Sequence, residues 1–281
     1  MAKSDWNPVI EAQNDGLAIP VVGRWALSKY NLVGRYCQIF TTSMKRKWPN
    51  LVYIDLFSGS GYAKIKGSNQ IVYGSPLIAL SIPVPFTKYI LCEKDEELAD
   101  ALKTRVGRDF GDKDITLFKG DANEIVDDIK NALPRFSRES GMLSFCFVDP
   151  YSLNLHFETI KKLGNLKMDF LILLALHMDA NRNYKSYLEK ENDKIDLFIA
   201  DTGWRTAKVE SNESFVRFLA EHFKKNMQEL GYKVTGTFQQ IRSDAKNLPL
   251  YYLAFFSKHN LGNTFWKEVQ KYSNPQQSLD F

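Results

Sequence analysis

Four short apolar runs that each end in an acidic residue constrain this chain more than any other feature. Three of the runs lead directly into Asp55, Glu93 and Asp149, and the fourth leads into Asp121 through Lys119 and Gly120. Apolar runs of this length, bounded by polar residues, are typical of strands buried in a sheet. The spacing therefore predicts four strands, each with an acid at its carboxyl end.

Segments with apolar residues at helical spacing lie between these strands. They cover residues 95–106 and residues 123–133. Strand and helix in alternation indicate a mostly parallel sheet with helices on both faces, so we expect a Rossmann-like, doubly wound α/β fold. Ligands of such sheets bind outside the carboxyl ends of the strands. All four acids are expected at that edge.

The strand that ends at Asp55 runs into a glycine-containing turn. The turn holds Phe57, Gly59 and Gly61, and glycine lets a ligand approach the main chain because it has no Cβ and tolerates a positive φ. We expect a loop over residues 61–75 to cover the turn and a helix to begin near Ser75. The third glycine of the dinucleotide-binding fingerprint is absent, so the turn indicates a cofactor site only together with the strand-end acids.

The four acids suit separate roles toward a nucleoside cofactor. Glu93, at the end of the second strand, can accept hydrogen bonds from two ribose hydroxyls. Asp121 and Ala122 follow the third strand, where an adenine amino group would be recognised. Strand-end acids also cap helices, and for a single acid that interpretation is the simpler one. Four acids in register favour the cofactor.

This layout resembles the class I S-adenosylmethionine-dependent methyltransferases, through residues 55–61, Glu93, residues 121–122 and residues 149–151. Over most of residues 22–270 the chain looks more closely like the three-Cys-motif partner proteins (TcmP). The matching residues there include Lys29 in the N-terminal helix, Gly203-Trp204 and the segment 251–259. The resemblance implies a radical-SAM-like three-Cys-motif protein as partner. It also implies S-adenosylmethionine as cofactor, held by Asp55, Phe57, Gly59, Gly61, Glu93, Asp121 and Ala122.

Asp149, Pro150 and Tyr151 also resemble the Asp-Pro-Pro-Tyr motif of methyltransferases that act on amino groups of adenine or cytosine. That likeness implies a catalytic role for the three residues, with the carboxylate binding an amine and the tyrosine stacking on a planar base. The second proline is absent here, which leaves the target atom open. A proline turn that closes a strand is the alternative interpretation.

The excess of positive charge is confined to the first 50 residues. The net charge is +4, and this segment holds seven Lys/Arg against three acids. Lys45, Arg46 and Lys47 end a helix expected over residues 22–48, with a break near Gly34. The three cations could contact the phosphates of DNA or RNA, or they could form a solvated helix end, where positive charge suits the helix dipole.

Three further residues, with Lys29, are candidates for substrate contact. His177 and Asp179 follow a fifth strand predicted over residues 169–174, so they lie on the ligand side and could polarise a substrate. Trp204 offers a plane on which a base could stack. A hydrogen-bonded structural role for His177 and core packing for Trp204 are the simpler alternatives.

The pattern predicts a helical extension over residues 1–50, a methyltransferase domain over 51–270 and a flexible tail over 271–281. Inside the domain we expect a helical insertion over 184–211, a helix over 214–230 and two late strands, 233–238 and 250–256. The last six residues, Gln276 to Phe281, resemble the Gln-x-x-Leu-x-Phe motif that binds the replication sliding clamp. The tail could instead fold back onto its own domain.

Composition narrows the class further. The three cysteines are far apart and lack metal-binding spacing, so we expect no metal. The most apolar run is too short to span a bilayer and there is no cleavable leader, so we expect a cytoplasmic protein without membrane contact. The expected function is methyl transfer from S-adenosylmethionine, with a nucleic-acid base as substrate. The alternatives are a methyltransferase-fold binding or regulatory module and a methyltransferase for proteins or small molecules.

Overall fold

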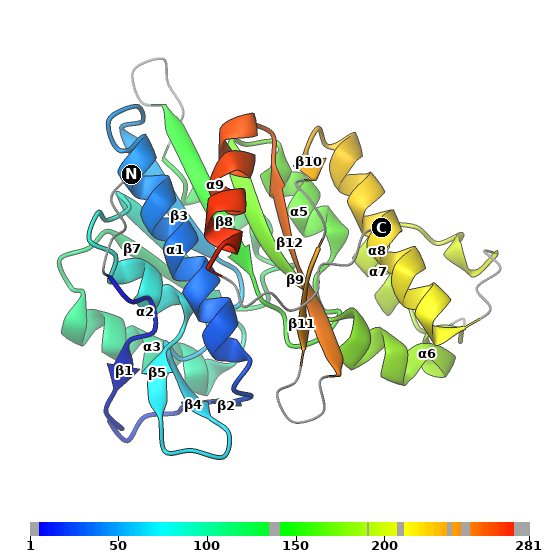
Figure 1. Ribbon diagram of the computed structural model, residues 1–281, viewed down its shortest axis with the longest axis horizontal. Helices are drawn as coiled ribbons and strands as arrows, with labels where there is room; N and C mark the ends of the chain where they lie inside the picture. Colours follow the sequence, from blue (N-terminus) through cyan, green and yellow to red (C-terminus); the bar gives the residue numbers. More distant parts are fainter. Residues whose placement is uncertain are drawn as a thin grey trace.

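The computed structural model describes residues 6–134, 141–189, 191–206, 211–234, 238–242 and 248–272. Helices cover both faces of a large sheet, and a small sheet lies at one end of it (Figure 1). The segments 184–211 and 271–281 fall partly outside the described residues, and Gln276 to Phe281 fall wholly outside them. The domain boundaries given above therefore stay predictions.

The large sheet confirms the expected Rossmann-like fold. Its strand order is β10-β12-β9-β8-β3-β6-β7, with β11 paired to β12. Five neighbouring strands, from β9 to the edge strand β7, are parallel: β3 (Asn50–Asp55), β6 (Lys88–Glu93), β7 (Ile115–Lys119), β8 (Met142–Val148) and β9 (Met168–Leu174). Three antiparallel strands complete one side: β10 (Lys233–Val234), β11 (Gln239–Arg242) and β12 (Pro249–Ser257). Strands lie in both late segments expected from the sequence, and β11, which the sequence pattern did not predict, is a third that also pairs with β12.

Each face of the sheet is covered by its own set of helices, and each set forms a separate apolar core. One core includes α1 (Ala26–Met44), α2 (Ser75–Leu80), α3 (Glu96–Asp109) and α9 (Asn260–Gln270). The other includes α4 (Val126–Asn131), α5 (Phe157–Gly164), α7 (Lys194–Ile199) and α8 (Asn212–Glu229). A π-helix (Leu176–Ala180), α6 (Asn181–Tyr187) and a 3-10 turn (Trp204–Thr206) lie in the connection between β9 and α8.

The helix α1 is continuous, so the break expected near Gly34 is wrong. A Cβ on Gly34 would lie 2.5 Å from the Cβ of Pro8 and 2.9 Å from a methyl of Ile78. The glycine is therefore needed because two segments approach the helix closely, and not because the helix bends there. α1 buries Leu32, Tyr36 and other residues in the core, so this N-terminal helix packs on the sheet.

The loop expected over residues 61–75 is also wrong, because most of it forms a hairpin. β4 (Tyr62–Ile65) and β5 (Ile71–Tyr73) pair with each other, and β1 (Glu11–Ala12) and β2 (Val21–Val22) extend them to a small sheet of order β1-β5-β4-β2. Aromatic and β-branched residues (Tyr62, Ile65, Ile71, Val72 and Tyr73) favour strands here, and the glycine and lysines among them obscured that pattern. The helix α2 then begins at Ser75, as predicted.

The sequence pattern did not predict α9, which packs antiparallel to α1 on the same face of the sheet (Figure 1). Trp266 and Phe265 of α9 are buried against the core. No helix in the described part of the chain is long and apolar enough to cross a membrane.

Candidate functional site

The carboxyl ends of the parallel strands meet at one edge of the large sheet, and the small sheet lies at that edge (Figure 1). The chain runs outward from β3 to β6 and β7 and then returns to β8 on the other side of β3. The point where the strand order reverses, the topological switch point of the sheet, therefore lies between β3 and β8. Asp55 ends β3 and Asp149 follows β8, so both acids flank this switch point.

The turn after β3 leaves one glycine open and packs the other. Gly59 has φ +61°, and a Cβ built on it would meet no atom within 4 Å. Gly61 has φ +84°, and its Cβ would lie 3.0 Å from Leu77 and Leu102. The main chain at Gly59 is therefore accessible to a ligand, whereas Gly61 is glycine because the helices behind it approach closely.

Glu93 lies directly against this turn. One carboxylate oxygen accepts a hydrogen bond from the backbone N–H of Gly59 at 2.7 Å, and the other accepts from the N–H of Asp95 at 2.9 Å. Each oxygen retains a second lone pair, so the carboxylate can still accept bonds from a ligand. The Glu93 carboxylate thus links the end of β6 to the turn that follows β3.

Asp55 is fully buried beneath the turn. It accepts hydrogen bonds from the hydroxyl of Tyr53 at 2.9 Å, from the N–H of Phe57 at 3.3 Å and from Ser75. Burial raises the pKa of Asp55 to about 7, although these hydrogen bonds oppose the rise. The Asp55 carboxyl therefore stabilises the conformation of the turn from below and is not exposed to a ligand.

Asp121 and Asn123 form the corresponding pair after β7. Asp121 accepts bonds from the backbone N–H and the side-chain amide of Asn123, both at 2.9 Å, and from the ammonium of Lys94 at 2.9 Å. Burial alone would raise the pKa of Asp121, but these donors lower it, so the carboxylate is charged at neutral pH. Ala122 is buried in the core beside them. Asp121 therefore stabilises the loop after β7 through Asn123, and it lies at the carboxyl edge of the sheet.

Asp149 forms a buried ion pair with Lys29 of α1. The Lys29 ammonium also lies over the rings of Trp25, at 5.2 Å, and Tyr30, at 4.8 Å. Burial by itself would lower the pKa of Lys29, but the neighbouring Asp149 carboxylate raises it above its ordinary value. The first turn of α1 is thereby fixed against the loop after β8, which brings Lys29 into the site with the acids.

The two residues after Asp149 differ sharply in exposure. Pro150 is buried, whereas Tyr151 is 89% exposed, the most exposed large apolar side chain in the described chain. An aromatic ring held in solvent beside a strand-end carboxylate offers a planar surface to a ligand. The structure thus leaves Tyr151 available for stacking.

His177 and Asp179 lie at the same edge but have different surroundings. The imidazole Nε2 of His177 is 2.9 Å from the hydroxyl of Tyr252, which also accepts from the amide of Gln240 at 3.2 Å. Asp179 is buried and binds Tyr187, Asn183, Lys194 and the N–H of Leu153. Burial opposes ionisation, yet these donors lower the pKa of Asp179. Asp179 therefore fixes the loop after β8, while His177 belongs to a polar cluster.

The remaining candidates lie away from this edge. Trp204 is buried against Phe215 in the core, and its indole N–H donates to Asp196 at 2.5 Å. Lys45, Arg46 and Lys47 are exposed at the C-terminal end of α1, sixteen or more residues beyond Lys29. At 1.5 Å per residue that places them about 24 Å along the helix from the ion pair.

Sequence reasoning missed a buried arginine that fastens the N-terminal segment beside the turn. The Arg105 guanidinium donates to both carboxylate oxygens of Asp15, at 2.6 and 2.9 Å, and to the carbonyls of Ala18 and Ser60, at 3.0 and 2.7 Å. It lies 4.1 Å from the ring centre of Tyr62, and its hydrogen bonds lower the pKa of Asp15 to about 2. The pairing joins positions 90 residues apart, so no local pattern predicts it.

The described residues contain no cluster of three or more His, Cys, Asp or Glu side chains placed to hold a metal ion. The groups that the structure brings together at this edge are carboxylates, one buried lysine, an exposed tyrosine and an open glycine turn.

No protein-family model and no curated protein matches this sequence. Among solved structures, the protein LPL1258 from Legionella pneumophila, of the family model DUF519, is similar with a TM-score of 0.54 at 11% identity, over 88% of this chain and 93% of that one. An O-methyltransferase from Bacillus cereus in complex with SAH gives 0.43 at 14%, over 80% of each chain. Trm1 from Pyrococcus horikoshii with S-adenosyl-L-methionine gives 0.46 at 13%, over 92% and 64%.

At 11% identity, the likeness to the Legionella protein concerns the fold alone. The two methyltransferases fall below a TM-score of 0.5, and we base no conclusion on them. Membership of the three-Cys-motif partner family stays a prediction.

Proposed function

We propose that this chain binds S-adenosylmethionine and transfers its methyl group. The observation that carries the proposal is the open main chain at Gly59, bonded to the Glu93 carboxylate and placed at the switch point of the sheet. A turn with a positive φ and no atom in front of it is what a nucleoside cofactor needs to approach the backbone. The donor and acceptor groups around it fit that cofactor.

The residues at the edge divide into three contacts. The turn at Gly59 would carry the amino-acid portion of the cofactor, Glu93 would accept from the ribose hydroxyls, and Asp121 with Asn123 would recognise the adenine. When bound, the cofactor supplies an electrophilic methyl group on a sulfonium. The protein then needs little acid–base chemistry and acts mainly by alignment and by excluding water.

Asp149 and Tyr151 would orient the acceptor of the methyl group. Lys29 compensates the charge of Asp149 and fixes its carboxylate, which can accept a bond from a target amino group through its remaining lone pairs. Tyr151 is exposed beside it and can stack on a planar base. A heteroaromatic amine therefore fits this part of the site.

A nucleic acid is the substrate class that the surroundings of the site support best. Arg24 lies one residue before the N-cap of α1, about 7 Å along the helix axis from Lys29. Lys64 is exposed on β4 and Lys66 is exposed directly after it, and the backbone of β4 pairs with β2 just before Arg24. These three cations and an exposed tyrosine at one edge suit a single strand, with phosphates on the cations and a base on the ring.

Isothermal titration calorimetry with S-adenosylmethionine, followed by transfer of labelled methyl to single-stranded RNA and DNA, tests the proposal. We expect the wild-type chain to bind the cofactor and Glu93→Gln to bind it about tenfold more weakly, because a charge-assisted hydrogen bond to the ribose is lost. Failure of the wild-type chain to bind would overturn the proposal.

The same assay, repeated with protein and small-molecule acceptors, separates the narrower possibilities. Label in protein or in small molecules, with none in nucleic acid, would support the third function class expected from the sequence. Binding without transfer to any acceptor would instead support a module that works through a partner, such as a radical-SAM-like three-Cys-motif protein. Sliding-clamp binding through Gln276 to Phe281 is a separate prediction, to be tested with the six residues deleted.

A further inference from the structure

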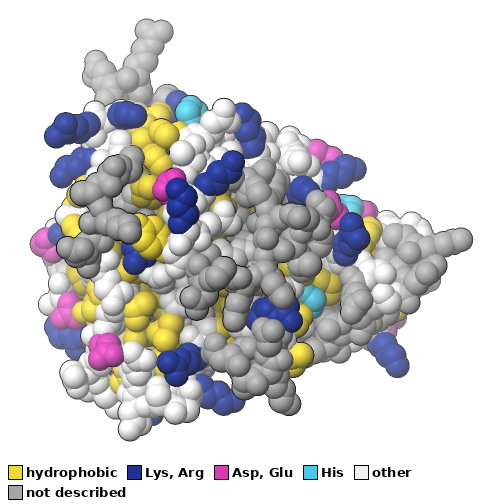
Figure 2. Space-filling model, viewed as in Figure 1, with side chains coloured by type: hydrophobic (Ala, Val, Ile, Leu, Met, Phe, Trp, Pro, Cys, Tyr) yellow, Lys and Arg dark blue, Asp and Glu magenta, His cyan; other side chains and the backbone are white. Residues whose placement is uncertain are grey.

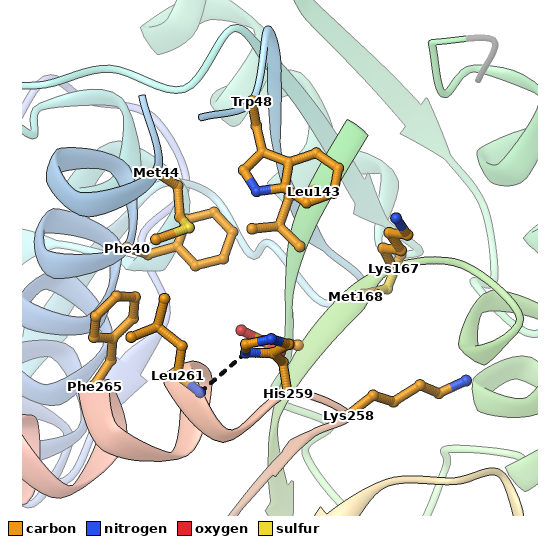
Figure 3. Close-up of a pocket in the computed structure, with 12 residues that line it drawn as sticks. Phe40, Met44, Trp48, Leu143, Lys167, Met168, Lys258, His259, Leu261 and Phe265 are labelled. Carbon is orange, nitrogen blue, oxygen red and sulfur yellow. Dashed lines mark hydrogen bonds between the residues drawn. The ribbon is translucent and has the colours of Figure 1, made fainter. Parts of the chain in front are cut away.

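A pocket of about 390 Å³ lies at the opposite edge of the large sheet, where the parallel strands begin (Figure 3). Its walls come from the end of α1, the starts of β8 and β9, and the first turn of α9. It is lined by Phe40, Met44, Trp48, Leu143, Lys167, Met168, Asp169, Lys258, His259, Leu261, Gly262 and Phe265. A cavity of this size with mainly apolar walls is in the range of small-molecule sites.

The pocket is built from residues that the candidate methyltransferase site does not use. Four separate chain segments converge on it, and the side chains of Phe40, Met44 and Phe265 are themselves buried. Gly262 keeps the first turn of α9 close to the sheet, since a Cβ there would lie 2.4 Å from the hydroxyl of Ser257 and 2.9 Å from the carboxylate of Asp169. The walls are therefore fixed by packing.

Polar groups around the pocket are few, and each is held in place. The Nδ1 atom of His259 accepts from the backbone N–H of Leu261 at 3.1 Å, so in the neutral ring Nε2 carries the proton (Figure 3). Lys167 lies over the ring of Trp48 at 4.9 Å, and Lys258 donates to the carbonyl of Gly164 at 2.6 Å. The lining thus offers the Lys167 cation and one imidazole donor, while the Lys258 ammonium is held by Gly164 and the ring of Tyr232.

Cationic side chains outnumber acidic ones around the pocket. The exposed cations Lys45, Arg46 and Lys47 directly precede the lining residue Trp48, and Lys and Arg side chains gather over this end of α1 in Figure 2. Asp169 is the one acid among the lining residues, and its carboxylate already accepts from the hydroxyls of Tyr36 and Ser257. An apolar cavity under a cationic mouth is complementary to an anion with an apolar body.

We propose that this pocket binds a small amphipathic anion, with its apolar body between Phe40, Leu143 and Phe265 and its carboxylate toward Lys167 and His259. Such a ligand would bind at the edge of the sheet remote from the methyl-transfer site. The site is independent of the proposed methyltransferase activity, because none of its lining residues contributes to the turn at Gly59 or to the Lys29–Asp149 pair.

Three probes with the same ten-carbon chain test the charge preference: decanoate, decanol and decyltrimethylammonium. Calorimetry with the full chain should show that decanoate binds most tightly and decyltrimethylammonium most weakly. Equal or tighter binding of the cation would overturn the proposal, since the aromatic walls and Asp169 would then form a cation site. Absence of binding by all three probes would overturn it as well.

Two variants locate the binding. Leu143→Trp should fill the cavity and abolish decanoate binding, and Lys167→Met should weaken it about tenfold because one charge-assisted contact is lost. The matched control is Lys64→Met, which removes an exposed lysine at the other edge of the sheet and should leave decanoate affinity unchanged. Circular dichroism on each variant confirms the fold. Unchanged affinity in both pocket variants would place the ligand elsewhere.

Discussion

The two edges of the large sheet, at the carboxyl ends and at the amino ends of its parallel strands, are lined by different kinds of side chains. At the carboxyl edge, Asp55, Glu93, Asp121 and Asp149 are surrounded by hydrogen-bond donors, and the glycine turn stays open. At the amino edge, the ends of α1 and α9 close over an apolar pocket with a single buried acid, Asp169. One edge presents polar groups to a ligand, and the other presents apolar walls under cations.

The difference follows from the direction of the strands. Loops that leave the carboxyl ends of parallel strands lead to helix N-termini, so acids and glycines accumulate there and anionic or polar ligands can be bound by main-chain N–H groups. The amino edge receives the C-terminal end of α1, where cations such as Lys45 are favoured, and α9 also begins there. The two edges therefore carry different charged groups, and a substitution at one edge leaves the residues of the other edge unchanged.

Breaking the ion pair at the carboxyl edge should have the largest effect. Lys29→Met keeps most of the apolar stem but leaves Asp149 partly buried without its counter-charge. Removal of one partner of a buried pair costs about 3–5 kcal/mol, and we expect the lower end because Asp149 retains some exposure. Chemical denaturation measures the change.

The double variant Lys29→Met with Asp149→Asn is the control for that prediction. It removes both charges, so most of the lost stability should return. If the double variant were as unstable as the single one, the contribution of Lys29 would lie in its packing on Trp25 and Tyr30 rather than in the ion pair.

The open turn gives the next largest effect, on binding rather than on stability. Gly59→Val places a β-branched side chain at φ +61°, in the space assigned to the cofactor, and should weaken S-adenosylmethionine binding more than a hundredfold. Gly67→Val is a matched control, because Gly67 has φ +79° and equally open surroundings in the β4–β5 connection. Calorimetry should show normal cofactor affinity in the control. Equal losses in both variants would point to backbone strain alone.

The buried acid at the amino edge predicts a pH dependence. Burial, opposed by bonds from Ser257 and Tyr36, raises the pKa of Asp169 from 3.8 to about 6. Between these values the folded protein holds a proton that the unfolded chain has released, so the free energy of unfolding falls as pH rises through this window. Asp169→Asn removes that fall. At 1.36 kcal/mol per pKa unit, the fall in the free energy of unfolding cannot exceed about 3 kcal/mol, and we expect a fall of roughly 2 kcal/mol by pH 8.

Comparison of wild type and variant at pH 4 and pH 8 checks this prediction. Asp55, whose pKa is raised to about 7, makes the wild type lose further stability over a similar range, so only the difference between the two proteins reports Asp169. A difference that stayed constant with pH would show that Asp169 does not titrate in this window.

Sequence reasoning predicted the carboxyl edge well and the amino edge hardly at all. The acids and glycines of the carboxyl edge occupy strand ends, so their chain positions follow from the alternation of strands and helices. Asp55, Glu93, Asp121 and Asp149 accordingly lie at one edge. Their roles toward a cofactor stay predictions until binding is measured.

The amino edge and the small sheet depend on contacts between distant segments. The pocket joins Phe40, Leu143, Met168 and Phe265, and Arg105 reaches back 90 residues to Asp15. Gly34 is a packing site for Pro8, which no helical periodicity reveals. Such contacts are set by tertiary packing, so a single sequence without structure cannot supply them.

The smallest expected effects come from the surface cations, and they compare the two edges directly. Replacement of Arg24, Lys64 and Lys66 by Ala should weaken binding of single-stranded RNA. The slope of log affinity against log salt should fall by up to about 2, since each lost phosphate contact accounts for about 0.7. Replacement of Lys45, Arg46 and Lys47, also exposed but about 24 Å along α1 from Lys29, should leave the slope unchanged.

The same two triple variants should show the opposite pattern in their affinity for decanoate. Loss of Lys45, Arg46 and Lys47 reduces the positive potential at the mouth of the pocket and should weaken decanoate binding a few-fold at low salt, whereas loss of the other three cations should not. Fluorescence anisotropy for RNA and calorimetry for decanoate, at two salt concentrations, give all four values. If Lys45, Arg46 and Lys47 instead controlled the RNA slope, the strand would cross the amino edge. The phosphate-binding surface would then be the one that the sequence pattern first indicated, and the separation of the two edges by charge and ligand would fail.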